Sequence, residues 1–119
     1  DNLKAIKKII NTNKLFGQWN DFIVNANWTS NIKEGFFKLW VNGQLSYHYI
    51  GRTVAPDDQI TVQFGIYRGA AQSSGDANHV VYYDEIRKAK SCKKLKLGKL
   101  GFSCHDLENQ KIEKIYRLQ

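Results

Sequence analysis

Apolar and polar residues alternate along much of the chain, which is the period of a β-strand that buries one face. The alternating runs cover Trp19–Trp28, Gly35–Val41, Gln44–Ile50, Gln59–Arg68 and His79–Arg87. Asn42-Gly43 separates the second run from the third and favours a two-residue hairpin turn, because both central residues of that turn need a positive φ. Consecutive strands at this spacing predict an all-β fold, an antiparallel β-sandwich of the jelly-roll type.

The two ends of the chain have other patterns. Between Leu3 and Ile10 the apolar positions recur at helical intervals, which favours a short amphipathic helix or a distorted edge strand. Residues 106–118 are expected to form a second helix with Asp106 as its N-cap. We therefore predict a β-sandwich portion over residues 1–88 and a basic C-terminal appendage over residues 89–119.

The sandwich is expected to be partial. Five strands are few, because a sheet with one apolar face needs a second layer to cover it. The chain also begins with Asp1 and contains no Met, as a mature or excised piece would. We expect a missing N-terminal half or a second chain to complete the sandwich.

Composition agrees with one β-rich domain. Hydrophobic residues make up 42% of the chain and aromatic residues 13%, which is enough for a core of ordinary density. No run approaches the roughly 18 apolar residues that a membrane span requires, so no membrane partner is expected.

The net charge of +7 is concentrated at the two ends. Residues 89–119 hold eight Lys or Arg and three acids, and residues 1–14 hold four Lys and one acid, whereas residues 15–88 hold six basic residues and seven acids. This distribution favours solvated lysine-rich ends over a nucleic-acid interface. We expect no nucleic-acid partner.

Cys92 and Cys104 are the only cysteines. They could close a disulfide in an oxidising compartment, or they could be two buried free thiols. Zinc binding is not expected, because His105 directly follows Cys104 and there is no second Cys-x-x-Cys element. We expect no metal and no cofactor, and a secreted or periplasmic location.

Four motifs occur in a fixed order: Gly17–Trp28, Phe37–Gly43, Phe64–Arg68 and Val81–Arg87. Together they resemble the C-terminal portion of the heparin lyase I family of polysaccharide lyases, which are concanavalin-like jelly rolls. The resemblance implies β-elimination on a uronic-acid polysaccharide. That reaction needs a group that neutralises the uronate carboxylate and a base, often Tyr or His, that removes the C5 proton.

The resemblance also implies an incomplete catalytic set. Related jelly-roll lyases carry a strand of the form Tyr-Phe-Lys-Ala-Gly-x-Tyr, whose first Tyr is catalytic. Here Thr61 occupies that position and Gln63 the position of the Lys, and a threonine cannot transfer a proton as a phenol does. The second tyrosine is present as Tyr67, our candidate catalytic residue, and Asn25 stands where relatives often carry His.

Six further residues are candidates for substrate binding: Asn25, Asn27, Lys38, Trp40, Gln63 and Arg68. Sugars bind to planar aromatic faces and to polar groups that form paired hydrogen bonds, and an Arg can pair with a carboxylate through two of them. The alternative is an ordinary solvent-facing sheet surface. His48 and His79 are expected to be structural or exposed.

The leading hypothesis is a polysaccharide lyase-like domain that acts on, or binds, an acidic uronic-acid polysaccharide. The alternative is a non-catalytic, lectin-like carbohydrate-binding module, which Thr61 and Gln63 favour directly. Binding of nucleic acid through the basic ends is a third hypothesis, and the near-neutral middle of the chain argues against it.

Overall fold

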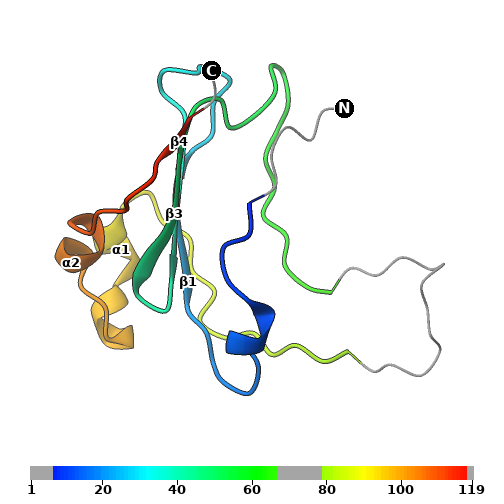
Figure 1. Cartoon of the computed structure of the whole chain (residues 1–119), viewed down its shortest axis with the longest axis vertical. Helices are drawn as coiled ribbons and strands as arrows, with labels where there is room; N and C mark the ends of the chain where they lie inside the picture. The colour runs from blue at the N-terminus through cyan, green and yellow to red at the C-terminus, as the bar shows by residue number, and fades with distance from the viewer. Residues whose placement is uncertain (1–6, 67–78, 118–119) are drawn as a thin grey trace.

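The computed structural model describes residues 7–66 and 79–117, and its centre is one four-stranded sheet (Figure 1). In chain order the elements are the 3-10 helix η1 (Thr12–Lys14), strands β1 (Phe22–Asn27), β2 (Phe36–Val41) and β3 (Gln44–Ile50), helix α1 (Cys92–Leu95), the 3-10 helix η3 (Leu97–Leu100), helix α2 (Cys104–Glu108) and strand β4 (Tyr116–Arg117). The sheet order is β1-β2-β3-β4. The expected β class with short helical segments is confirmed.

The hairpin between β2 and β3 forms at the predicted dipeptide. Asn42 and Gly43 have φ values of 51° and 84°, as a turn of this type requires. The antiparallel register contains one irregularity, because Trp40 pairs with Leu45 whereas Leu39 pairs with Tyr47. Ser46 is the extra residue of this β-bulge, and beyond it every pair on β3 is shifted by one position.

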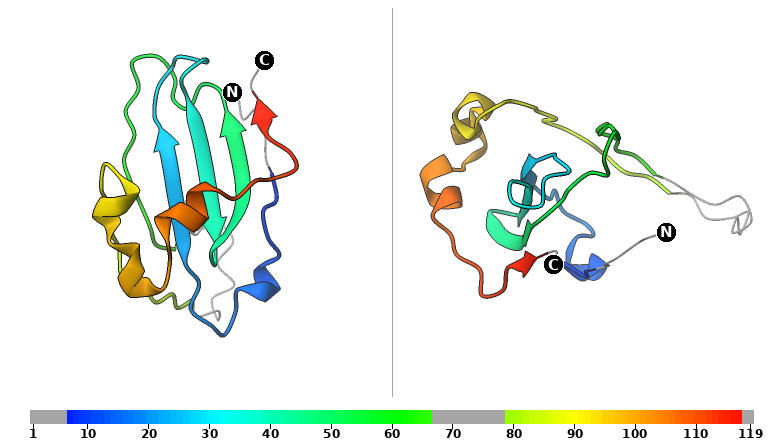
Figure 2. Two further views of the ribbon diagram at one scale, coloured as in Figure 1. Left: turned by 90° about the vertical axis from the view of Figure 1, so that its left-hand side faces the viewer. Right: turned by 90° about the horizontal axis from the view of Figure 1, so that it is seen from above.

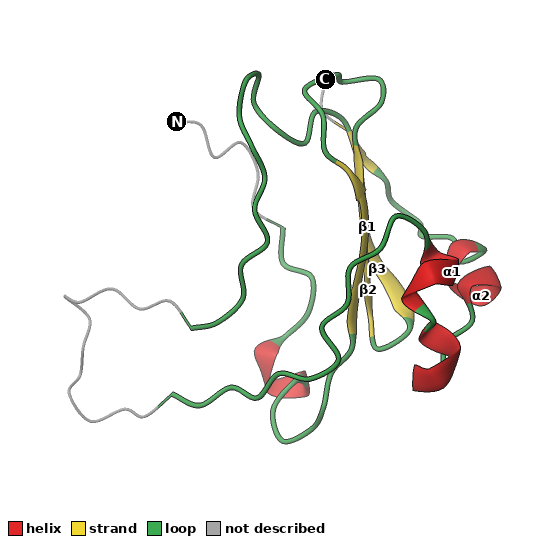
Figure 3. Ribbon diagram, turned by 180° about the vertical axis from the view of Figure 1, so that it is seen from behind, coloured by secondary structure: helices red, strands yellow, loops and turns green. Residues whose placement is uncertain are grey.

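The sheet has two different faces. Ile23, Trp40 and Leu45 lie side by side on one of them, which α1, η3 and α2 cover in part (Figure 2). We call this the helix-covered face. The opposite, apolar face carries Phe22 and Val24 among others, and Phe22 is 55% exposed. Figure 3 shows that all of the C-terminal helices lie on one side of the strands.

The core lies between the helix-covered face and the C-terminal segment. Trp40 is only 3% exposed and packs against Leu97 and Leu107. Its indole Nε1–H donates a hydrogen bond to the Leu107 carbonyl oxygen at 3.0 Å. Gln110 adds a polar connection, because its side chain donates to the Gly43 carbonyl at 2.7 Å and accepts from the backbone N–H of residue 45 at 2.7 Å. The division at residue 88 stays a prediction, but the appendage and the sheet share this core.

A disulfide joins Cys92, at the start of α1, to Cys104, at the start of α2, with a Cα–Cα distance of 6.0 Å. Both helices begin after a serine whose hydroxyl accepts a backbone hydrogen bond, Ser91 for α1 and Ser103 for α2. These two helices are too short to be stable alone, so the disulfide and the core hold them in place. Of the two alternatives for the cysteines, the structure contains the disulfide.

The predicted terminal helices are not formed as expected. The C-terminal one is wrong in extent, because α2 ends at Glu108, its N-cap is Ser103 rather than Asp106, and the chain then returns to the sheet as β4, parallel to β3. At the N-terminus residues 7–10 are not helical and residues 1–6 lie outside the described residues.

The strands predicted over 59–68 and 79–87 are also not formed within the described residues. Residues 59–66 and 79–87 form no strand and have no backbone-to-backbone hydrogen bond to any described residue. Their apolar side chains are largely exposed to solvent, and Phe64 for example is 60% exposed. The ring centroids of Phe64 and Tyr83 lie 5.2 Å apart. Residues 59–66 follow the side of the sheet opposite α1 and α2 (Figure 1). An alternating segment becomes a strand only when a neighbouring strand accepts its hydrogen bonds, and residues 7–66 and 79–117 contain no second sheet that could do so.

The disulfide should be required for the docking of the appendage. The double variant C92S/C104S should lose about 3 kcal/mol of stability, the effect expected for closing a loop of this length. In a W19F/W28F background, Trp40 is the single tryptophan, so its emission should shift to longer wavelength at urea concentrations where the disulfide-bonded parent is still folded. Equal urea midpoints for the two proteins would contradict this role.

Candidate functional site

A row of polar side chains crosses the helix-covered face next to the buried Trp40. Asn25 on β1 pairs with Lys38 on β2, and Lys38 pairs with His48 on β3. Asn25 is exposed, and Lys38 and His48 are half-buried. Arg117 extends the row, because β4 pairs Arg117 with Ile50, two residues beyond His48 on the same strand. We call Asn25, Lys38, His48 and Arg117 the polar row.

The polar row is electrostatically positive. Burial lowers the pKa of His48 below its ordinary value, and the positive charges of Lys38 and Arg117 lower it further. Within residues 7–66 and 79–117 the ion pairs are Arg87 with Glu85 and His105 with Asp106, so neither Lys38 nor Arg117 has a carboxylate partner there. The row therefore offers two cations to an anionic ligand.

This arrangement has chemical consequences. A histidine that stays neutral near pH 7 keeps a nitrogen lone pair that can accept a proton. Lys38 and Arg117 carry positive charges that can neutralise a carboxylate in the same place. Asn25 can both donate and accept hydrogen bonds. A neutral base beside a carboxylate-binding pair is the set of groups that removal of a proton next to a carboxylate requires.

The structure brings together two of the predicted site residues, Asn25 and Lys38. Asn27 lies on the same face, but its side-chain amide donates to the Glu34 carbonyl at 3.0 Å and so holds the turn that precedes β2. Trp40 was expected on an open surface and is instead buried under Leu107. It supports the row from the core and presents no free ring face.

The remaining predicted residues are not joined to this row. Gln63 is exposed in the segment 59–66, which follows the opposite side of the sheet. Tyr67 and Arg68 lie outside the described residues, so their roles stay predictions.

His48 and Arg117 are the residues that sequence reasoning missed. In a regular hairpin after Asn42-Gly43, Tyr47 would lie opposite Lys38. The bulge at Ser46 replaces it with His48. Arg117 joins the row only because the chain returns to the sheet as β4. Neither event has a local sequence signal.

Aromatic rings cross the apolar face instead. Trp28 and Phe37 have ring centroids 6.0 Å apart, Phe37 and Tyr47 6.2 Å, and Tyr47 and Tyr116 5.3 Å. We call these four residues the aromatic strip. Burial raises the pKa of Tyr47, and the neighbouring Tyr49 and Tyr116 raise it further, against a smaller opposing effect of Lys7. A phenol in this setting stays protonated, which makes it a poorer base than His48.

The comparisons with known proteins agree with a sugar-handling role. Residues 4–87 match the family model described as polysaccharide lyase, and this match includes Asn25, Lys38 and His48. The chain belongs to the polysaccharide lyase family. The matched region ends before α1, so the disulfide-bridged appendage and Arg117 lie beyond it. No curated protein and no solved structure matches the chain.

Across residues 7–66 and 79–117, no group of three or more His, Cys, Asp or Glu side chains is placed to hold a metal ion. In the same part of the chain, no helix has the length and apolar character to cross a membrane.

Lys38 should control the protonation of His48. In the variant K38Q the pKa of His48 should rise, because the positive charge that disfavours the imidazolium is removed. Titration of the imidazole signals by NMR measures this directly. K33Q removes a lysine that lies outside the polar row and should leave the titration of His48 unchanged, and an equal response to both substitutions would refute the assigned contact.

Proposed function

We propose that this polysaccharide lyase-family domain binds an acidic, uronic-acid polysaccharide along the polar row and cleaves it by β-elimination. The proposal is supported above all by one observation: two cations that have no carboxylate partner among the described residues flank a histidine whose pKa is lowered, in a chain of this family. The motifs resembling heparin lyase I favour that branch of the family.

In the proposed reaction Lys38 and Arg117 neutralise the uronate carboxylate, which makes the adjacent C5 proton more acidic. His48 accepts this proton. The electron pair of the C5–H bond then forms the C4–C5 double bond as the bond from C4 to the glycosidic oxygen breaks. The leaving oxygen takes up this proton from the imidazolium of His48, so the histidine ends the cycle neutral. Asn25 hydrogen-bonds the sugar at the β1 end of the row.

The other predicted site residues are not required for the reaction proposed above. Tyr67 stays a predicted catalytic residue, and Gln63 and Arg68 stay predicted sugar contacts. We further propose a second layer, from an N-terminal half or another chain, over the apolar face, since Phe22 and Val24 are exposed there. A secreted or periplasmic location is favoured by the disulfide.

A non-catalytic carbohydrate-binding module is the second candidate. It is favoured by Thr61, which replaces the tyrosine of the related pattern, and by the aromatic strip, because flat rings are the surfaces on which sugars stack.

Product formation separates the two candidates. Unsaturated uronate products absorb at about 235 nm, so mixing the protein with heparin, alginate or glucuronan should raise this absorbance. H48Q should lower kcat by about 10²-fold or more, the usual contribution of a general base, with a smaller change in KM. K38Q should lower kcat/KM by about tenfold or more, because the carboxylate loses a neutralising charge.

K33Q is the matched control for K38Q and should keep wild-type rates. If the wild-type protein binds one of these polymers and no absorbance appears, the β-elimination proposal fails and the binding module is supported. If H48Q retains the full kcat, the role of His48 as the base is refuted.

A further inference from the structure

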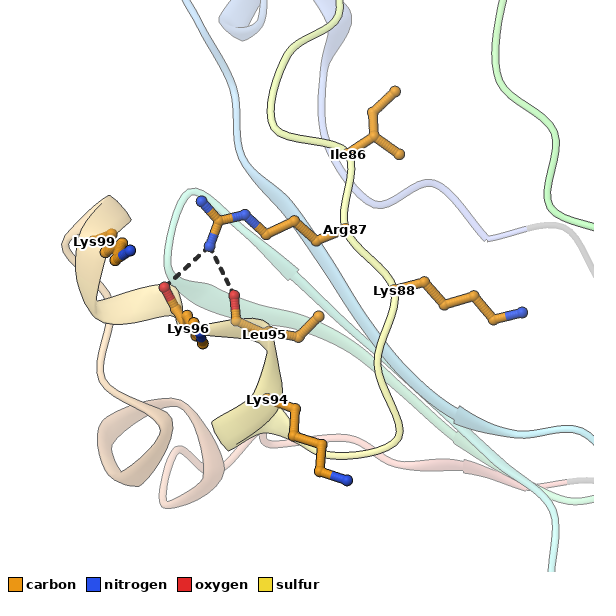
Figure 4. A pocket seen from close by; sticks show the side chains of 7 residues that line it. All are labelled: Ile86, Arg87, Lys88, Lys94, Leu95, Lys96 and Lys99. Atoms are coloured by element: carbon orange, nitrogen blue, oxygen red, sulfur yellow. Dashed lines mark hydrogen bonds between the residues drawn. The ribbon is translucent and has the colours of Figure 1, made fainter.

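A second basic site lies outside the polar row, in the appendage. A surface hollow of about 500 Å³ separates the segment before α1 from α1 and η3 (Figure 4). Its lining residues are Ile86, Arg87, Lys88, Lys94, Leu95, Lys96 and Lys99. Five of these seven side chains are cationic and none is acidic or aromatic. We call this hollow the lysine pocket.

Arg87 builds the pocket rather than serving as its ligand-binding group. Its Nη1 donates to the carbonyl oxygens of Leu95 at 2.7 Å and Lys96 at 3.0 Å, at the C-terminal end of α1 (Figure 4). Its Nε and Nη2 donate to the Glu85 carboxylate at 3.1 and 2.6 Å. The guanidinium is thus neutralised, and it fixes one wall of the pocket against the other.

The four lysines of the pocket, in contrast, have no such neutralising partner in the part of the chain that the structure describes. From residue 86 to residue 105 the chain has seven Lys or Arg and no Asp or Glu. Among the described residues none of these lysines forms an ion pair. Like charges held near one another repel, and a bound polyanion removes this repulsion while releasing counterions. A group of lysines that line one hollow is therefore suited to a ligand with several negative charges.

The direction of the polar row connects the two sites. The row runs across the strands from Arg117 in β4 to Asn25 in β1, the strand beside which α1 and η3 lie (Figure 2). A linear polymer bound along the row would leave the sheet at β1, next to the appendage. The disulfide and the core around Trp40 hold the appendage in that position.

We propose that the lysine pocket is an accessory anchoring site for the carboxylates or sulfates of an acidic polysaccharide, next to the polar row. This inference rests on the proposed function for the class of polymer. A lysine binds carboxylate or sulfate as a compact point charge. Single-stranded nucleic acid is less suited to the pocket, because no aromatic ring lines it for base stacking.

The test compares two variants of equal charge. K88Q/K94Q/K96Q/K99Q removes the lysines of the pocket, and K8Q/K14Q/K33Q/K111Q removes four lysines outside it. At about 100 mM NaCl the pocket variant should bind fluorescently labelled heparin or alginate at least about tenfold more weakly than wild type, with a shallower salt dependence. The control variant should change by less than about threefold, and K88R/K94R/K96R/K99R should retain the affinity. Equal loss in both glutamine variants would overturn the site, as would tighter, pocket-dependent binding of DNA of similar length.

Cleavage assays separate a failure of this site from a failure of the proposed function. The pocket variant should keep the wild-type kcat and raise KM for the polymer by about tenfold, because the row is intact and only the anchor is lost. Unchanged KM and Kd in the pocket variant of an active enzyme would overturn the anchor and leave the proposed function standing. Pocket-dependent binding of alginate or heparin by a wild type that releases no unsaturated product would support the anchor and overturn β-elimination.

Discussion

The contact between Trp40 and the segment around Leu107 is the interaction on which the rest of the structure depends. It is the point at which the sheet and the appendage share a core, and it combines burial of an indole ring with a hydrogen bond that satisfies its one polar group. The disulfide reduces the number of unfolded conformations of α1 and α2, but it does not by itself bring them to the sheet. Because Trp40 is buried, the open part of the helix-covered face begins at its neighbour Lys38, and this places the polar row.

The same packing explains why the row is polar and accessible. The C-terminal segment covers the Ile23–Trp40–Leu45 end of the face and then returns along the sheet as β4, which adds Arg117. The row is therefore bounded by an apolar core on one side and joined by a strand from the end of the chain. Partial burial beside this core lowers the pKa of His48, and two cations act in the same direction. The packing of Trp40 against the segment around Leu107 therefore contributes both to the stability of the fold and to the lowered pKa of His48.

The sequence predicted the hairpin at Asn42-Gly43 and the alternation of β1 and β2, because each follows from local turn chemistry or from strand period. It could not predict the burial of Trp40, which depends on a segment 67 residues away along the chain. It could not predict His48 either, because one bulge reverses the side on which each later residue of β3 points. The alternating segments 59–66 and 79–87 have the period of strands, but period alone supplies no hydrogen-bonding neighbour.

The charge distribution has a different meaning in the structure than it has along the chain. Along the chain, the net positive charge of residues 89–119 is typical of a solvated tail. In the fold, three of these lysines and Lys88 line one hollow beside β1. The disulfide and the hydrogen bonds of Arg87 restrain the backbone that carries them, so their charges stay closer together than in a flexible tail. In the proposed function, a cationic surface at the end of a cationic row would act on a polymer as one extended site, because a chain bound at the first position raises its own effective concentration at the second. The appendage, which lies outside the matched family region, would then contribute affinity for the polymer while the row determines the chemistry.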